Sequence, residues 1–372
     1  MDVKFAPVMA NAADFPEAII RATPGFGFSD VGLLWQKLQL GQCTYTRNGR
    51  AAIAIAAQQL KFPNQTNTVL LPAYHCPALV EPFLWLGYQV RFYPVQADLS
   101  VDVGVFQRLL TPDVSHCVVV QFFGFKQNAN QLIELAHAAG KRVLEDCAHG
   151  LVDFVASLQQ DDPRVSARIC SINKLLPTID GGLLYLRQQQ SRQPGYCSWL
   201  EELKGIAFLL KIPQRLERFR QRAKTRKSVA VSAQGTATEF KYFKPADLNS
   251  ASFRHTKWIL QYSNLEAIKA KRRANYRYLV AGLSGVAAGC CLYPVIADEA
   301  PYVLPFLLRD GQHFQHLRQQ KIQVLRWEEM APSGCDITEQ YRSRLIQLPC
   351  HHKLTRAELD YIIKAMAGLA EL

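Results

Sequence analysis

Between residues 48 and 187, short apolar runs of strand length alternate with segments whose apolar residues recur at helical spacing. Strands joined in turn by helices predict an α/β architecture with a largely parallel sheet. Such sheets bind ligands beyond the carboxyl ends of their strands, so chemistry is expected there. The runs that favour strands are 68–71, 89–95, 117–124, 142–147 and 168–172, and those that favour helices are 50–60, 77–87 and 128–140.

The chain has 372 residues, more than one hydrophobic core usually serves, so two domains are expected. Residues 188–250 interrupt the alternation, and a helical segment then leads to a strand–helix–strand tail. We expect a large domain over 1–250 and a smaller α/β domain over 251–372. In the tail, 292–296 and 302–308 favour strands, 313–320 favours a helix, and Thr355 is expected to cap a terminal helix.

The net charge of +12 is concentrated in one basic segment, Lys204 to Lys227, which holds nine Lys or Arg residues and one Glu. The rest of the chain is mildly basic and no DNA-binding motif accompanies the charge, so a nucleic-acid partner is not expected. Three interpretations of the segment stay open: a solvated helical face, a seat for a phosphate-bearing substrate, and contact with acidic membrane headgroups. The first is preferred, and the third is kept because the apolar sequence LKGIAFLL at 203–210 beside Arg-rich sequence is amphipathic.

No apolar run reaches the ~18 residues of a membrane span, and the N-terminus lacks the apolar centre of a signal peptide. The sequence therefore predicts a cytoplasmic protein. Its ten cysteines are scattered without a CxxC pair and do not indicate a disulfide framework. A zinc site at Cys350, His351 and His352 would lack a second ligand pair, so no metal site is predicted.

Two of the expected element ends carry chemically useful side chains. Gly49 and Arg50 begin an Ala-rich helix, whose free N–H groups and dipole can hold a phosphate. A plain helix N-terminus is an equally good interpretation. Asp146 ends an apolar strand and His149 follows three residues later, which suits either a functional carboxylate or a cap of the next turn.

Lys174 lies between two apolar runs, three residues after Ser171 and seven before Gly181. Lysines are mostly surface residues, yet an amine in an apolar site can form a Schiff base with an aldehyde. The Ser171 hydroxyl can reach the same phosphate as the helix at Gly49. Together these residues supply what pyridoxal phosphate (PLP) needs: an anion seat, an acid for the pyridine nitrogen and an amine for the aldehyde.

The sequence resembles the DegT/DnrJ/EryC1/StrS family of fold type I PLP-dependent aminotransferases, which mostly make amino sugars on nucleotide carriers. NGRAA at 48–52 is similar to the family's phosphate motif, SGTAA or SGRAA, and EDCAHG at 145–150 is similar to EDAAHA. SINKLLPTIDGG at 171–182 resembles the lysine motif, with the glycine pair at the same distance. Two longer segments, 71–95 and 348–363, resemble further parts of the family pattern.

The resemblance implies a three-layer fold like that of aspartate aminotransferase, with a mostly parallel sheet in the large domain, a smaller C-terminal α/β domain, and a homodimer. It implies that Lys174 is the catalytic Schiff-base lysine, that Asp146 pairs with the pyridinium nitrogen, and that His149 contacts the ring's phenolic oxygen. The phosphate would be held by Gly49, Arg50, Ala51 and Ser171.

Several positions depart from the family pattern. The family stacks an aromatic residue on the cofactor ring, and here that position is Cys76, beside His75. Which of the two faces the ring stays open. Asp180 stands where the family has Glu, and Ser171 lies three residues before the lysine where five is more common. The family loop that crosses the dimer interface is not recognisable around 241–252.

The leading hypothesis is transfer of an amino group from an amino-acid donor, glutamate first, to a nucleotide-linked keto sugar in polysaccharide, glycan or natural-product biosynthesis. The alternative keeps PLP but aminates a carbonyl on a cyclitol, polyketide or carrier-bound chain, which Cys76 and the basic segment motivate. A third hypothesis is a non-enzymatic regulatory or scaffolding protein, against which Lys174, Asp146 and Ser171 argue together. Lys174 also argues against the family's dehydratases, which carry His at that position.

Overall fold

The computed structural model describes residues 3–6, 18–27, 38, 40–160, 162–188, 194–210 and 240–371. Its main feature is a seven-stranded sheet in the order β1-β7-β6-β5-β4-β2-β3. Neighbouring strands from β3 to β6 pair in parallel, and β7 pairs antiparallel with both β6 and β1. The strands are β1 (Cys43–Thr46), β2 (Thr68–Pro72), β3 (Gln89–Tyr93), β4 (His116–Val120), β5 (Arg142–Asp146), β6 (Ala167–Ser171) and β7 (Gly182–Leu186).

Helices connect these strands, as the alternation predicts. The first is rich in alanine, and its buried small side chains let it pack closely on β6 and β7. Strand β4 is buried along its whole length, which explains its unbroken apolar run. The helices are α1 (Gly49–Leu60), α2 (Pro77–Trp85), α3 (Val103–Leu109), α4 (Ala129–Ala138) and α5 (Leu151–Ser157).

The strand expected over 117–124 is shorter than predicted. Strand β4 ends at Val120, and the chain turns through a 3-10 segment, η3 (Phe122–Gly124). Phe123 and Gly124 have positive φ angles of 59° and 90°, which strand geometry does not allow. The apolar run therefore continues past the sheet, into a turn that packs over its carboxyl edge. The strand expected to begin at Gly181 and Gly182 is β7. Sequence patterns did not predict β1 or α3.

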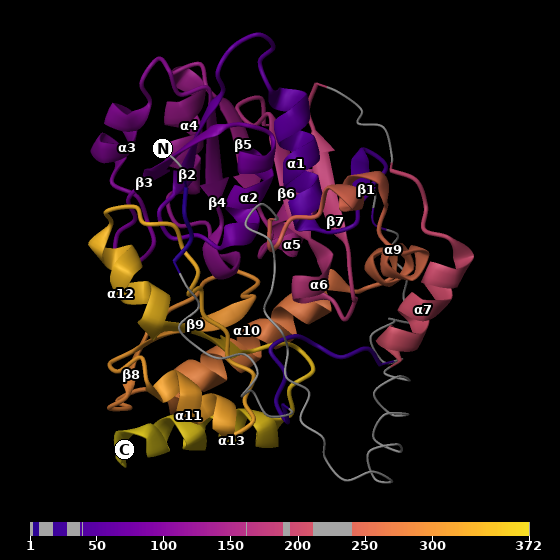
Figure 1. The fold of residues 1–372 in the computed structure, drawn as a ribbon. Coiled ribbons are helices and arrows are strands. Elements are labelled where there is room, and N and C mark those ends of the chain that lie inside the picture. Colours follow the sequence, from indigo (N-terminus) through magenta and orange to yellow (C-terminus); the bar gives the residue numbers. More distant parts are fainter. Residues whose placement is uncertain are drawn as a thin grey trace, which may run out of the picture.

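The C-terminal part forms a three-stranded antiparallel sheet in the order β10-β9-β8, below the large sheet in Figure 1. Its strands are β8 (Gly289–Cys291), β9 (Val303–Leu308) and β10 (Leu345–Pro349). The strand expected over 302–308 is confirmed, but the one expected over 292–296 is wrong, because pairing with β9 stops at Cys291 and Pro294 follows. Around this sheet lie α10 (Leu265–Gly282), α11 (His313–Gln319), α12 (Asp336–Arg344) and α13 (Arg356–Ala367), followed by η5 (Gly368–Glu371).

Thr355 caps α13 as predicted: its side chain accepts a hydrogen bond from the Glu358 N–H, and the Glu358 carboxylate accepts one from the Thr355 N–H. The single helical segment expected after residue 250 is two helices, α9 and α10, because Asn264 breaks the run and caps the second. The remaining elements are α6 (Ile172–Leu175), α7 (Trp199–Leu209), η4 (Pro245–Asn249) and α9 (Arg254–Gln261).

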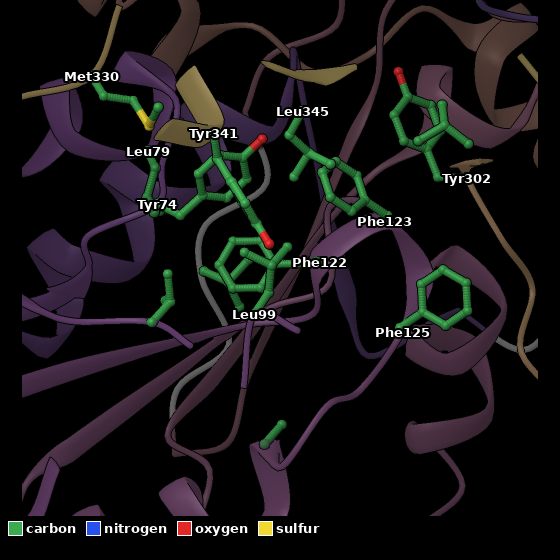
Figure 2. Close-up of a cluster of buried hydrophobic side chains, with 14 of the residues drawn as sticks. Tyr74, Leu79, Leu99, Phe122, Phe123, Phe125, Tyr302, Met330, Tyr341 and Leu345 are labelled. Atoms are coloured by element: carbon green, nitrogen blue, oxygen red, sulfur yellow. The ribbon is translucent and has the colours of Figure 1, made fainter. Parts of the chain in front are cut away.

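The apolar core is continuous between the two sheets. Figure 2 shows part of it, in which aromatic side chains from the strand ends of the large sheet lie beside residues of the C-terminal part. Tyr74 and Phe122 come from the first group, and Tyr302 and Tyr341 come from the second. The contact between the two parts therefore lies directly beside the carboxyl edge of the large sheet. None of the helices in the described ranges is long and apolar enough to cross a bilayer.

Candidate active site

A pocket at the carboxyl edge of the large sheet brings together the side chains that sequence reasoning singled out. Lys174 on α6, Asp146 at the end of β5, and His149 just after it all line this pocket. The other lining residues are Tyr74, His75, Cys76, Leu79, Val120, Gln121, Phe122, Ala148 and Trp327. The side chains close tightly on one another, leaving about 20 Å³, little more than a water molecule needs.

Asp146 is a buried carboxyl, only 7% exposed, at the end of a strand with apolar neighbours. Burial raises its pKa, and the positive charge of Lys174 opposes that rise. Its Oδ1 accepts a hydrogen bond of 2.8 Å from the Ala148 N–H. A carboxylate held in such a place gains from a cationic partner, which a protonated pyridine nitrogen provides.

His149 is held as a neutral ring. Its Nδ1 lies 3.0 Å from the Phe123 N–H and accepts that hydrogen bond, so the ring proton is on Nε2. Burial, assisted by the Lys174 charge, lowers its pKa well below the usual value. The ring lies between Phe123 and Tyr302, at centroid distances of 5.7 Å and 4.7 Å and nearly parallel to both. A neutral donor at Nε2 suits a phenolic oxygen.

The N-terminus of α1 lies against Ser171. A Cβ atom built on Gly49 would be 3.6 Å from the Ser171 Cβ, so the helix start and the end of β6 are in contact. The N–H groups of Gly49 and Arg50 have no partner inside the helix, as at any helix start. The Nε of Arg50 is buried without a hydrogen-bond partner. These donors suit an anion.

Ala51 differs from the other residues of this seat. Its N–H already donates to Asn48 Oδ1 at 3.0 Å, so it is committed to capping the helix. The Asn48 amide in turn donates to Asp247 at 2.8 Å. The side chain of Ser171 donates to Asn173 Oδ1 at 2.9 Å, within the lysine motif itself.

His75 and Cys76 differ in how firmly they are held. The His75 ring stacks on Phe92 at 4.7 Å, its Nδ1 lies 2.8 Å from the Ala73 carbonyl, and its Nε2 accepts from the Ala331 N–H. Both nitrogens and one face of this ring are therefore engaged, and burial lowers its pKa to about 4. Cys76 is half-buried at the start of α2, and burial raises the pKa of its thiol.

Asp180 and Gly181 hold the far end of the lysine motif. The buried Asp180 carboxylate accepts from the Phe253 N–H at 3.0 Å and from the Thr256 hydroxyl at 2.5 Å, and lies 3.3 Å from Arg47. Gly181 has a φ of +115°, and a Cβ there would lie 2.8 Å from Thr256 Cγ2. A side chain at this position would be strained and crowded, which explains the glycine.

Two residues of the site were missed in the sequence. Arg272 on α10 is completely buried and donates to the carbonyls of Leu175 at 3.0 Å and Tyr302 at 2.8 Å. It therefore fixes the turn that carries Lys174. Trp327 lies 5.8 Å from His149 and 4.8 Å from Tyr74, measured between ring centroids. Neither belongs to a recognised motif. Both are flanked in the sequence by charged residues, so the local sequence does not indicate that either side chain is buried.

Trp327 and Cys76 also line a second cavity, of about 230 Å³, on their other side. Its polar groups are Tyr242, Arg326, Glu328 and Glu329. Arg326 is committed, because it donates to Glu328 at 2.5 Å and to the carbonyls of Gly311 and Ser343. Glu328 is therefore paired with Arg326, and Glu329 accepts from both the Tyr242 hydroxyl and Lys241. A carboxylate can accept several hydrogen bonds, so these groups can still accept from the hydroxyl groups of a ligand.

The basic segment is described only as far as Leu210. Its first part is the end of α7, where Lys204 is exposed. Residues 211–227, which carry most of the charge, lie outside the described residues. Three or more His, Cys, Asp or Glu side chains arranged to hold a metal are not found within the described ranges.

The residues of the pocket fit PLP. They include an amine, a buried carboxylate and a neutral imidazole donor. The proposed phosphate seat at Gly49, Arg50, Ala51 and Ser171 is not part of the lining of this pocket; it lies where α1 starts against the end of β6, with the Arg50 Nε buried and without a hydrogen-bond partner. These are the groups that the aldehyde, the pyridine nitrogen, the phenolic oxygen and the phosphate of that cofactor require. PLP is larger than the space that the pocket leaves. Trp327 lines both this pocket and a neighbouring cavity, so we count its side chain as part of the site.

Comparisons with known proteins agree with this geometry. The sequence model of the DegT/DnrJ/EryC1/StrS aminotransferase family matches residues 34–168, which agrees with the resemblance drawn from the segments at 48–52, 71–95 and 145–150. The matched residues include Gly49, Cys76 and Asp146 and end six positions before Lys174. A comparison with curated proteins finds no match.

Solved structures share the fold. DesV from S. venezuelae is 17% identical, with a TM-score of 0.59, over 89% of this chain and 85% of that one. The aminotransferase TlmJ from Streptoalloteichus hindustanus is 18% identical, with a TM-score of 0.61, over 89% and 88%. Helicobacter pylori PseC, an aminotransferase involved in pseudoaminic acid biosynthesis, is 14% identical, with a TM-score of 0.60, over 88% and 86%. These likenesses confirm the predicted three-layer fold.

Proposed function

We propose that this chain, a PLP-dependent aminotransferase of the DegT/DnrJ/EryC1/StrS type, moves an amino group from an amino-acid donor to a nucleotide-linked keto sugar. We take glutamate as the donor, and polysaccharide, glycan or natural-product biosynthesis as the setting. The observation that carries the proposal is the convergence of Lys174, from the lysine motif, with Asp146 and His149, from the acid motif, on one pocket.

We assign the roles as follows. When bound, PLP supplies an electron sink that stabilises negative charge at the substrate carbon bearing the amino group. The Lys174 amine binds the cofactor and moves the proton at that carbon. Asp146 holds a proton on the pyridine nitrogen, and His149 donates from Nε2 to the phenolic oxygen. Both partners are buried, where an electrostatic contact is stronger than in water.

The phosphate seat in this proposal consists of Gly49, Arg50 and Ser171, with Ala51 contributing only if Asn48 releases its N–H. For the ring-stacking position we propose Cys76, since the His75 ring is already engaged by Phe92, Ala73 and Ala331. A thiol gives less contact than an aromatic ring, so Trp327 would then be the large aromatic side chain near the cofactor.

For the acceptor we propose the cavity of about 230 Å³ beside Cys76. Its carboxylates and the Tyr242 phenol match the hydroxyl groups of a sugar, which both donate and accept hydrogen bonds. A cyclitol also carries hydroxyl groups, so the same cavity would suit this alternative acceptor. A polyketide or other apolar chain is less well matched to this lining.

We also propose the division into a large domain over 1–250 and a small domain over 251–372, a homodimer as the working unit, and a cytoplasmic location. The continuous core between the two sheets supports a small domain that packs firmly on the large one. Size-exclusion chromatography with light scattering tests the dimer independently of catalysis.

Reduction of the cofactor-loaded protein with borohydride, followed by peptide mass spectrometry, tests the assignment of Lys174. The expected product is a single modified peptide that contains residue 174. The variant Lys174→Ala should lose it, whereas Lys364→Ala, an exposed lysine on α13, should keep it. Modification elsewhere in the native protein would refute the assignment.

The acceptor is tested separately, by screening nucleotide-linked keto sugars, keto-cyclitols and carrier-bound ketones with glutamate as the donor. Turnover of a nucleotide keto sugar supports the leading proposal. Turnover of only a cyclitol or a carrier-bound carbonyl would replace it with the alternative, while leaving the cofactor chemistry intact.

A further inference from the structure

Helix α7 carries its large apolar side chains toward solvent. Trp199 is 69% exposed, Leu203 is 53% exposed and Phe208 is 55% exposed. Leu200 and Ile206 are also exposed, and within the helix only Gly205 and Leu209 are buried. Such side chains are normally buried, and a helix with this pattern has an apolar surface that nothing in the described chain covers.

The polar attachments of α7 fix this orientation. Gly205 packs against the α9 region so closely that a Cβ there would lie 2.9 Å from His255 and 3.1 Å from Phe253. Glu202 accepts from the Arg254 N–H at 2.8 Å and lies 3.3 Å from His255 Nδ1. One side of the helix is therefore bound to the body of the protein, and the apolar side cannot turn inward without breaking these contacts.

Two neighbouring aromatic residues extend the surface beyond the helix. Tyr196 is 63% exposed and Trp258 on α9 is 42% exposed. We call Tyr196, Trp258 and the five exposed apolar residues of α7 the α7 surface. Because a large apolar side chain offers roughly 150–250 Å², the five helical residues alone expose on the order of 400–600 Å². That equals the largest apolar patches of ordinary monomers, which are often functional.

The charges around the α7 surface are positive. Lys257 and Arg254 lie over the Tyr196 ring, at 4.4 Å and 5.0 Å from its centroid. The carboxylates of the helix are committed, Glu201 to capping the helix with Ser198 and Glu202 to the α9 region. The chain that leaves α7 at residue 210 continues with the cationic sequence of the basic segment, whose net charge from 204 to 227 is +8.

We propose that the α7 surface docks this protein onto a membrane that contains anionic phospholipid. Tryptophan, phenylalanine and leucine on an exposed helix insert between lipid headgroups, and nearby Lys and Arg pair with the phosphates. Charge favours this occupant over a second copy of the chain, because two such surfaces face to face would bring Arg254 and Lys257 of one copy against the same cations of the other. The helix, of 11 residues, would lie along the membrane plane.

Vesicle co-sedimentation of the full-length, cofactor-loaded protein tests the proposal. Vesicles of phosphatidylcholine with one quarter phosphatidylglycerol are compared with vesicles of phosphatidylcholine alone, at low and at high salt. We expect binding to the anionic vesicles, weaker binding at high salt, and a blue shift of tryptophan fluorescence that Trp199→Phe largely removes.

The triple variant Trp199→Ser, Leu203→Ser, Phe208→Ser should bind anionic vesicles at least tenfold more weakly. The matched control is Val295→Ser, which removes an equally exposed apolar residue (87% exposed) far along the chain and should bind as the native protein does. Circular dichroism checks that the variants fold. If the triple variant does not fold, the single variant Phe208→Ser is used in its place and should show a smaller loss of vesicle binding.

Three results would overturn the proposal. The first is native protein that does not sediment with anionic vesicles. The second is a triple variant that binds the anionic vesicles as strongly as the native protein does, since attraction would then rest on charge alone. The third is a triple variant that is a monomer where the native protein is a dimer in the absence of lipid, which would make the α7 surface a contact between copies.

Discussion

The pocket around Lys174 and the α7 surface break the usual distribution of side chains in opposite ways. At the pocket, a carboxyl, an imidazole and a guanidinium are buried, and each is held by hydrogen bonds to the backbone. On α7, Trp199, Leu203 and Phe208 stand in water. Buried polar groups and exposed apolar groups both cost stability, so each marks a place where folding alone does not explain the sequence.

The variant Asp146→Asn gives the largest expected effect, and it tests the role of the buried polar groups in the pocket around Lys174. We expect kcat/KM to fall about 10²–10³-fold, because the amide cannot balance a cationic ring nitrogen. Burial raises the pKa of Asp146 in the folded state, so its ionised form destabilises the fold near neutral pH. Urea unfolding of the apoprotein should therefore show equal or higher stability for the variant. Asp153→Asn, on α5 and partly exposed, is the control and should change neither quantity appreciably.

Two adjacent arginines, one buried and one at the surface, allow the effect of burial on the free energy of unfolding to be measured. Arg272→Met removes the hydrogen bonds to the Leu175 and Tyr302 carbonyls and leaves them buried without donors, at a cost of about 2–4 kcal/mol in the free energy of unfolding. Arg273→Met breaks an ion pair with the exposed Asp298, which is worth less than about 1 kcal/mol. Denaturant unfolding measures both. Equal losses for the two variants would show that Arg272 is not a structural clamp.

Lowering the pH should weaken the fold through another buried polar group of the large sheet, His116 at the start of β4, away from the pocket. Burial lowers the pKa of His116 to about 4, against 6.5 when unfolded. Between these values the unfolded chain binds more protons, so stability is complete above pH 6.5 and falls as the pH drops toward 4. This residue alone contributes about 3 kcal/mol to that fall.

The expected signature is a smaller slope of unfolding free energy against pH in the variant His116→Asn, whatever its stability at neutral pH. His137→Asn, which changes an exposed histidine, should keep the native slope. An unchanged slope in His116→Asn would show that this ring does not stay neutral in the folded protein.

Neighbouring positions on α7 give the smallest effect. Phe208→Ser should change the free energy of unfolding by no more than about 0.5 kcal/mol, because its side chain is already in water. Leu209→Ser, on the buried side, should cost about 2–3 kcal/mol. If both variants lost the same stability, the apolar side of α7 would be packed against protein and the contrast between the two regions would disappear.

The sequence predicted the parts of the site that lie at ends of periodic elements. Lys174, Asp146 and His149 follow strands whose apolar runs are readable, and the structure brings them to one pocket, while their catalytic roles stay predictions. Arg272 could not be found, since Lys271 and Arg273 flank it and only tertiary packing decides which side chain is buried. Trp327 meets Tyr74 across more than 250 residues of chain, a distance that no local pattern spans.

The fold was predictable to a similar extent. Alternating apolar runs predicted the parallel strands, and Thr355 predicted the start of α13. The errors arose where an apolar run does not mean a strand: residues 122–124 pack as a turn, and 292–296 follow the last pairing with β9. Strand β1 was missed because its pairing partner β7, more than its composition, defines it.

The grip of Arg272 constrains how substrates can arrive. Its guanidinium, on α10, is completely buried and holds Leu175 beside Lys174 and Tyr302 just before β9. A motion that separated the two sheets would break these hydrogen bonds and leave a buried cation unpaired, which is costly. We therefore expect the two sheets to stay together when substrate enters, and the pocket to enlarge by rotation of side chains such as Trp327, which lines both cavities.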